Sequence, residues 1–242
     1  MVTKRARRLR GGLALMALAC TPGSGWPAPP ELHDSLLNRS VAAYNSNDET
    51  ALQAILRFGM DNHIPLGLVV DDQLCSTVIT GLRVEHASAE AVIGEFAKKL
   101  PSYHWDVEDQ AVVFVPNSLS EGVARFLNVM PPPYTVSEGV LQGQVVWAWM
   151  DIRAALRPKE GTAFDILSSV DSEKWPALAL RDMTVRQVLN RLVARKGGGA
   201  WVLIPFRDFD KVADHRPFWV LDYSDKLSAQ SAGQYCSGGQ GP

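Results

Sequence analysis

The sequence has little charge of one sign. It holds 24 Lys and Arg residues against 26 Asp and Glu residues, which leaves a formal net charge of −2. Proteins that bind nucleic acid usually show a basic excess or a basic patch, so nucleic acid is not an expected partner. Hydrophobic residues at 46% and charged residues at 21% are typical of a globular protein with one large core or two small ones.

The sequence also lacks a long apolar run of the kind that crosses a bilayer, which takes about 18–20 residues. Leu13 to Ala19 are apolar but short, follow a basic run over Lys4–Arg10, and end in the small residues Ala17 and Ala19. This order is typical of a secretory signal peptide. We predict a signal peptide over 1–19 and a location in the periplasm or on the periplasmic face of the outer membrane. The alternative is a disordered basic tail on a cytoplasmic protein.

Cysteine is scarce, with three residues in the chain. Cys20 follows the predicted cleavage site and is a candidate for lipidation, although Met16–Ala19 match a lipobox only in part. A lipid there would tether the protein to a membrane surface without inserting it. Cys75 and Cys236 can form a disulfide in an exported chain. Because Cys236 lies in a tail rich in Gly, Ser and Gln, an unpaired, buried Cys75 is the favoured alternative.

Motifs that would indicate a reaction centre are missing. The five histidines show no metal-ligand spacing, and none is placed by spacing to act as a base for Cys75. Gly197–Gly199 close a predicted helix, whereas the glycines of a phosphate loop open one. Asp71–Asp72 and the pair Asp208 and Asp210 lack the other oxygen ligands of a calcium loop. We therefore predict no catalytic, metal-binding or cofactor-binding residues and no cofactor.

Apolar periodicity predicts an α+β fold. Helical spacing of apolar residues covers 52–60, 92–100, 119–130 and 185–193. Alternation or short apolar runs predict strands over 66–70, 82–84, 105–107, 111–115, 178–180, 201–204 and 218–221. A further helix is expected over 149–156 and a strand over 164–167. Pro131–Pro133 end the third helix and separate the chain into two halves.

Polar residues at the expected helix starts support these boundaries. Capping-box spacing is found three times, at Ser46 with Glu49, Ser118 with Glu121 and Thr184 with Gln187. Ser88 is the expected cap of the helix over 92–100.

The two halves match without a gap at an offset of 96 residues (Ser88 to Thr184). Apolar positions coincide along this offset, and Trp105 matches Trp201, so both tryptophans are expected in the core. The pattern predicts two small modules, each a short mixed or antiparallel sheet packed under two helices. The domains are then 1–19 signal peptide, 20–45 linker and amino-terminal helix, 46–117 first module, 118–139 connecting helix and Pro-rich linker, 140–223 second module, and 224–242 flexible tail.

Three stretches of the first half resemble the short amino-terminal domain shared by secretins and TonB-dependent receptors. They are ALQAILRFGMDNHIPLGLVV over 51–70, GLRVEHASAEAVIGEFAKKL over 81–100 and YHWDVEDQAVVFVP over 103–116. The second half carries a similar run, ALALRDMTVRQVLNRLVARKGGGAWVLIP, over 177–205. The resemblance implies a binding module of the cell envelope that contacts regulatory or assembly partners. No pore or barrel segment is expected within these residues.

We therefore expect a non-enzymatic protein-interaction or scaffolding module whose partners are envelope proteins. Trp147, Trp149, Trp175 and Trp219 are harder to bury together, and tryptophan is enriched where partners dock. These four residues are the candidate interaction surface, with core packing as the alternative. Two other functions remain open at this stage: an exported hydrolase-type enzyme, and a small-ligand binder with a Trp-lined pocket.

Overall fold

The computed structural model describes residues 35–131, 133–140, 174–195, 199–203, 219–220 and 236. The described helices are α2 (Ala51–Asp61), α3 (Asp72–Ser76), α4 (Ala89–Lys99), α5 (Glu121–Asn128) and α7 (Val185–Arg195). The described strands are β1 (Ser40–Asn45), β2 (Glu49–Thr50), β3 (Pro65–Val69), β4 (Val78–Ile79), β5 (Arg83–Ser88), β6 (Tyr103–Glu108), β7 (Ala111–Pro116), β8 (Tyr134–Val136), β9 (Gly139–Val140), β10 (Lys174–Trp175), β11 (Leu178–Leu180), β12 (Gly199–Leu203) and β13 (Trp219–Val220).

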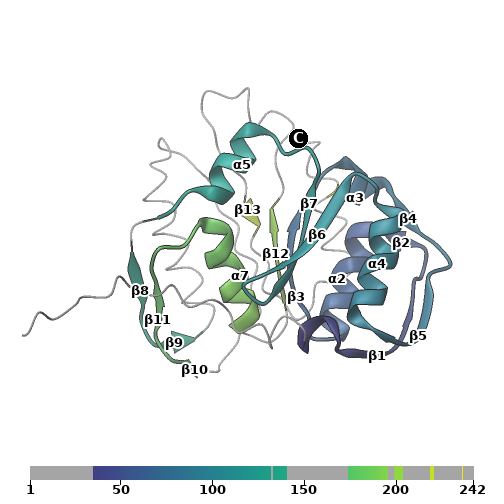
Figure 1. The fold of residues 1–242 in the computed structure, drawn as a ribbon, viewed down its shortest axis with the longest axis horizontal. Helices are drawn as coiled ribbons and strands as arrows, with labels where there is room; N and C mark the ends of the chain where they lie inside the picture. Colours follow the sequence, from purple (N-terminus) through teal and green to yellow (C-terminus); the bar gives the residue numbers. More distant parts are fainter. Residues whose placement is uncertain are drawn as a thin grey trace, which may run out of the picture.

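The centre of the fold is a five-stranded mixed sheet in the order β13-β12-β3-β7-β6. β3 pairs in parallel with both β7 and β12, while each outer strand is antiparallel to its neighbour. Helices α2 and α4 cover one face of this sheet, and α5 and α7 cover the other (Figure 1). The α+β prediction is confirmed.

β3 explains why the sheet has a core on both faces. Its sequence, PLGLV, is apolar throughout, and all five residues are buried. Leu66 and Leu68 belong to the core under α2 and α4, whereas Val69 belongs to the core under α5 and α7. A central parallel strand is enclosed on both faces, and a continuous apolar run is the pattern that this position requires.

The strands of the two halves share one sheet, which differs from the prediction of a separate sheet in each half. β12 and β13 come from the second half, yet β12 joins directly onto β3 of the first half, with Trp201 opposite Gly67. Each half contributes a hairpin to opposite sides of β3. The reason is the apolar character of β3, because a strand buried on both faces also requires hydrogen-bonding neighbours on both edges.

The 96-residue offset reappears in the structure. α4 spans Ala89–Lys99 and α7 spans Val185–Arg195, and β6 and β12 begin at Tyr103 and Gly199. Each of these strands is followed by an antiparallel partner, β7 or β13. The strand before each helix also has an antiparallel partner, since β1 pairs with β5 and β8 pairs with β11. The helix and strand expected over 149–156 and 164–167 lie outside the described residues.

The helix caps confirm two predictions and correct two. Ser88 caps α4, and Thr184 and Gln187 form the reciprocal capping box of α7. The cap of α2 is Thr50 with Gln53, not Ser46 with Glu49, because residues 49–50 first pair as β2 with β4. The cap of α5 is Ser120, which accepts from the Val123 amide, in place of Ser118.

β1 occupies residues that the sequence assigned to a linker and a helix. It forms a two-stranded ribbon with β5, and only Val41 and Tyr44 of its six residues are buried. The ribbon is interrupted opposite Ala42, where His86 adopts a φ of 50°. This interruption breaks the two-residue alternation that identifies a strand in a sequence.

A disulfide joins Cys75 of α3 to Cys236. The Cα atoms of the two residues lie 5.4 Å apart, and both side chains pack against the core under α2 and α4. The favoured expectation of an unpaired Cys75 is therefore wrong. The sequence separation of 161 residues made the pairing difficult to predict, since it attaches a late segment of the chain to the first half.

Candidate functional site

The predicted interaction surface falls largely outside the described residues. Cys20, Trp147 and Trp149 all lie outside them. Trp175 is opposite Gly139 in the β9–β10 pair, and Trp219 is opposite Leu203 in the β12–β13 pair. For these two tryptophans the described structure gives the backbone position alone, so the surface that the four residues would form remains a prediction.

Two kinds of feature are absent from the described residues. No group of three or more His, Cys, Asp or Glu side chains within that part of the chain is arranged to hold a metal ion. None of the described helices is long and apolar enough to span a bilayer.

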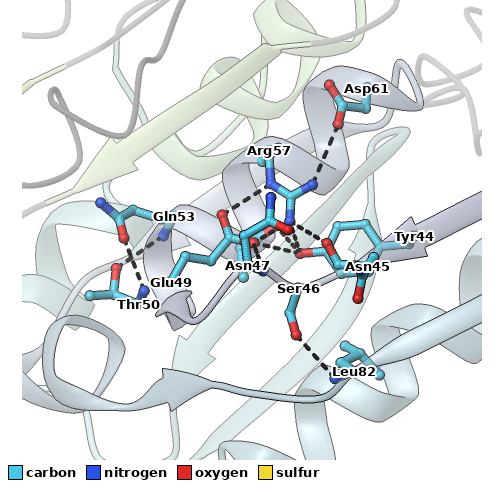
Figure 2. Close-up of polar contacts among 11 residues, drawn as sticks. Tyr44, Asn45, Ser46, Asn47, Glu49, Thr50, Gln53, Arg57, Asp61 and Leu82 are labelled. Atoms are coloured by element: carbon cyan, nitrogen blue, oxygen red, sulfur yellow. Dashed lines mark hydrogen bonds and ion pairs between the residues drawn. The ribbon is translucent and has the colours of Figure 1, made fainter.

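A dense polar cluster surrounds Arg57, which lies on α2 beside the turn between β1 and β2 (Figure 2). Both carboxylate oxygens of Glu49 accept from its guanidinium group, with Nε 3.0 Å from Oε2. The same group donates to the backbone carbonyl of Asn45 at 2.8 Å and lies 4.8 Å from the centre of the Tyr44 ring. The Tyr44 hydroxyl donates in turn to the carbonyl of Ala54 at 3.1 Å.

The pKa values of this cluster follow from its burial and its ion pair. Burial alone would raise the pKa of Glu49, but the hydrogen bonds and the charge of Arg57 outweigh it and hold that pKa below its ordinary value of 4.5. The hydrogen bonds that Arg57 donates to Glu49 raise the pKa of Arg57. Burial raises the pKa of Tyr44. Every member thus keeps one protonation state near neutral pH, and the cluster fastens β1 and β2 to α2.

A second polar cluster joins the two halves at the tip of the β6–β7 hairpin. Arg186 Nε lies 2.9 Å from Glu108 Oε2, in an ion pair whose angle is not that of a hydrogen bond, and Arg191 Nε lies 3.4 Å from Asp109 Oδ1. Burial raises the pKa of Glu108, against the opposing charge of Arg186. Asp109 and Gln110 have φ values of 47° and 69°, as a two-residue hairpin turn requires. These contacts fix the position of β6 relative to α7.

β6 itself ends the sheet, because no described strand pairs with its outer side. The Asn117 backbone amide donates to the Ser102 carbonyl, so these two residues form a hydrogen-bonded pair. Every second residue after Ser102 (His104, Asp106 and Glu108) then forms the same kind of pair with β7. In an antiparallel pair, the residues that alternate with the hydrogen-bonded ones direct their N–H and C=O groups away from the partner strand. Tyr103, Trp105 and Val107 therefore direct theirs toward the open edge.

Two of the outward N–H groups on this edge have local partners. The Tyr103 amide donates to the Leu100 carbonyl at 2.9 Å, and the Val107 amide donates to its neighbour Asp106 at 2.7 Å. Among the described residues no such partner is found for the Trp105 amide, whose side chain is partly buried against the core under α2 and α4. The central residue of the strand thus presents a donor and an acceptor.

The edge is held in place from its start. The Tyr103 side chain is buried, and its hydroxyl donates to the Val69 carbonyl at 2.9 Å and accepts from the Asp71 amide at 3.0 Å. Burial raises the pKa of this hydroxyl, so it stays protonated. The sequence predicted a strand around Trp105 but gave no signal that it would be terminal, because strand order depends on pairing across the two halves.

No protein-family model, curated protein or solved structure matches this chain. The resemblance to the secretin and TonB-receptor domain therefore remains a prediction that rests on the quoted sequence stretches.

Proposed function

We propose that this protein is an exported, non-enzymatic interaction protein of the cell envelope that accepts an extended strand from an envelope partner on the open edge of β6. In such strand addition, main-chain hydrogen bonds provide affinity and flanking side chains provide selectivity. The observation that supports it is the outer side of β6, along which no described strand pairs, with the Trp105 N–H and C=O groups directed outward.

The internal repeat supports this use of the edge. β12 occupies the position in the second half that β6 occupies in the first, and β13 corresponds to β7. The equivalent outer side of β12 is already paired, since β3 runs along it in parallel over Gly199–Leu203. Within this chain, one strand in this position of the repeat, β12, therefore accepts a neighbour on its outer side. Its counterpart β6 has no such neighbour among the described strands.

The disulfide supports the proposed location. Disulfides form and persist in oxidising compartments such as the periplasm and are rare in the cytosol. The pair Cys75–Cys236 lies against the core of the first half, where it stabilises the folded chain. This feature agrees with the signal-peptide pattern over 1–19, which is an independent property of the sequence.

The proposal is tested by changing one backbone donor. Trp105→Pro removes the outward N–H group, and proline is tolerated on an edge strand. Trp105→Ala is the matched control, because it removes the same side chain and keeps the N–H group. The immobilised mature protein should capture a defined set of envelope proteins, and Trp105→Pro should lose it while Trp105→Ala retains it. Equal capture by both variants, each shown to be folded by circular dichroism, would exclude strand addition at this edge.

A further inference from the structure

The open edge of β6 is complementary to itself. Trp105 lies at the centre of its outward-facing groups, with Tyr103 before it and Val107 after it. When two such strands meet in antiparallel orientation around a two-fold axis at Trp105, this residue faces its own copy and each amide donates to the other carbonyl. Two-fold interfaces of this kind use the same patch on both subunits.

The side chains beside Trp105 agree with this register. His104 and Asp106 are both exposed and lie on the same face of β6, the face opposite Trp105. A two-fold axis at Trp105 places Asp106 directly opposite His104 of the second copy, and the reverse. Opposite side chains in such a non-hydrogen-bonded pair have Cβ atoms about 4.5–5.5 Å apart, which suits a hydrogen bond from imidazole to carboxylate.

Asp106 has a further role in this arrangement. It accepts from the Val107 amide at 2.7 Å, which keeps that donor satisfied while the edge is open. In the antiparallel register, the Val107 amide faces the Tyr103 carbonyl of the second copy. Asp106 can then accept from His104 of the second copy in place of the Val107 amide. Both the Val107 amide and the Asp106 carboxylate therefore remain hydrogen-bonded. The Tyr103 amide keeps its bond to the Leu100 carbonyl.

We infer that the β6 edge accepts the β6 edge of a second copy of this chain, which forms a two-fold dimer with one continuous sheet, in the register that pairs Trp105 with Trp105 and Asp106 with His104. This inference rests on the proposed function, because it names the partner strand for the same edge. The two partly buried Trp105 side chains would cover each other across the axis, and aromatic pairs are favourable at such positions.

The register is tested by exchanging two residues. Sedimentation velocity of the mature protein, over concentrations up to about 300 μM because an edge-to-edge interface is small, should show a reversible dimer. His104→Asp places two carboxylates opposite each other and should weaken dimerisation by about 10-fold or more. Asp106→His should also weaken it. The double variant with both changes restores an Asp opposite a His and should return the dissociation constant to within about 3-fold of the original.

A control on another exposed strand separates this effect from a general change of charge. His86→Asp makes the same substitution on β5, where the residue is also exposed, and should leave dimerisation unchanged. A monomer at every concentration, or a double variant no better than His104→Asp, would overturn the inference. A monomeric protein whose partner capture is still lost in Trp105→Pro and kept in Trp105→Ala would reject the second copy alone and leave the proposed function standing.

Discussion

Asn190 on α7 accepts a hydrogen bond from the indole N–H of Trp201 on β12, at 2.7 Å between Oδ1 and Nε1. Both residues are 0% exposed, which makes this a buried polar contact between a helix and the central sheet. The Asn190 Nδ2 group has no hydrogen-bond partner in the described structure. The contact therefore orients Trp201, the largest fully buried side chain among the described residues, and leaves one buried amide nitrogen without a hydrogen bond there.

Removing one partner of this hydrogen bond should lower the free energy of unfolding. Trp201→Phe keeps an aromatic ring but removes the indole N–H donor. In the described structure, the buried Asn190 side chain is then left without a hydrogen-bond partner for Oδ1 as well as for Nδ2. We expect the free energy of unfolding to fall by about 1–3 kcal/mol, the typical penalty for a buried polar group without a partner. Urea denaturation measures this loss. In a double-mutant cycle, adding Asn190→Leu should recover part of the stability; strictly additive losses would show that the hydrogen bond contributes nothing.

Gly67 on β3 should tolerate no side chain. An added Cβ atom would lie 2.4 Å from Cζ2 of Trp201, closer than any real carbon contact. Gly67→Ala should therefore lower the free energy of unfolding by about 1–3 kcal/mol through overpacking. Gly94 on α4 is the matched control, because a Cβ there meets nothing within 4 Å. Gly94→Ala should stabilise the protein by up to about 1 kcal/mol, and a loss of stability in both variants would contradict this explanation.

The Glu49–Arg57 ion pair should make stability depend on pH in the acidic range. The folded-state pKa of Glu49 lies below its ordinary value of 4.5, so its contribution is present above the ordinary value and is lost as the pH falls through the folded-state pKa. Glu49→Gln should cost about 1–2 kcal/mol at pH 7 and progressively less below pH 4. Chemical denaturation across pH 3–7 tests this. Glu95→Gln, which removes an exposed pair with Lys98, should change stability little at any pH.

Reduction of the Cys75–Cys236 disulfide should destabilise the fold. The bond closes a loop of 161 residues, and a cross-link over so long a loop restricts the unfolded chain strongly. We expect the free energy of unfolding to fall by about 2–5 kcal/mol when a dithiol reductant is added. A variant with both Cys75→Ser and Cys236→Ser should have the same free energy of unfolding as the reduced protein, and reductant should not change it. Equal stability of oxidised and reduced protein would mean that the cross-link constrains nothing.

The elements with strong apolar periodicity were predictable from the sequence. α4 and α7, and the strands at β3, β6, β7, β11 and β12, lie where the pattern placed them, because their buried faces repeat at the helical or strand period. β1 was missed because its buried residues Val41 and Tyr44 are three positions apart. Their spacing follows from an interrupted ribbon, which depends on the backbone of His86 in a different strand.

Contacts between the halves could not be predicted from the apolar periodicity of the sequence. Three features depend on which strands become neighbours: the terminal position of β6 among the described strands, the pairing of β12 with β3, and the ion pairs to Glu108 and Asp109. Periodicity reports the face that a residue buries, not the strand beside it. The capping box of Thr184 and Gln187, by contrast, lies within one turn of helix and was predictable for that reason.

The position of β3 between β7 and β12 has a consequence for how the chain is made. β3 leaves the ribosome well before β12, so the first half must remain with one apolar strand edge unpaired until residues 199–203 follow. A sheet that cannot close early keeps a newly made chain from completing its fold. Such a delay suits a polypeptide that has to be threaded through a membrane before it folds, and it makes a fragment that stops before β12 prone to associate through that edge.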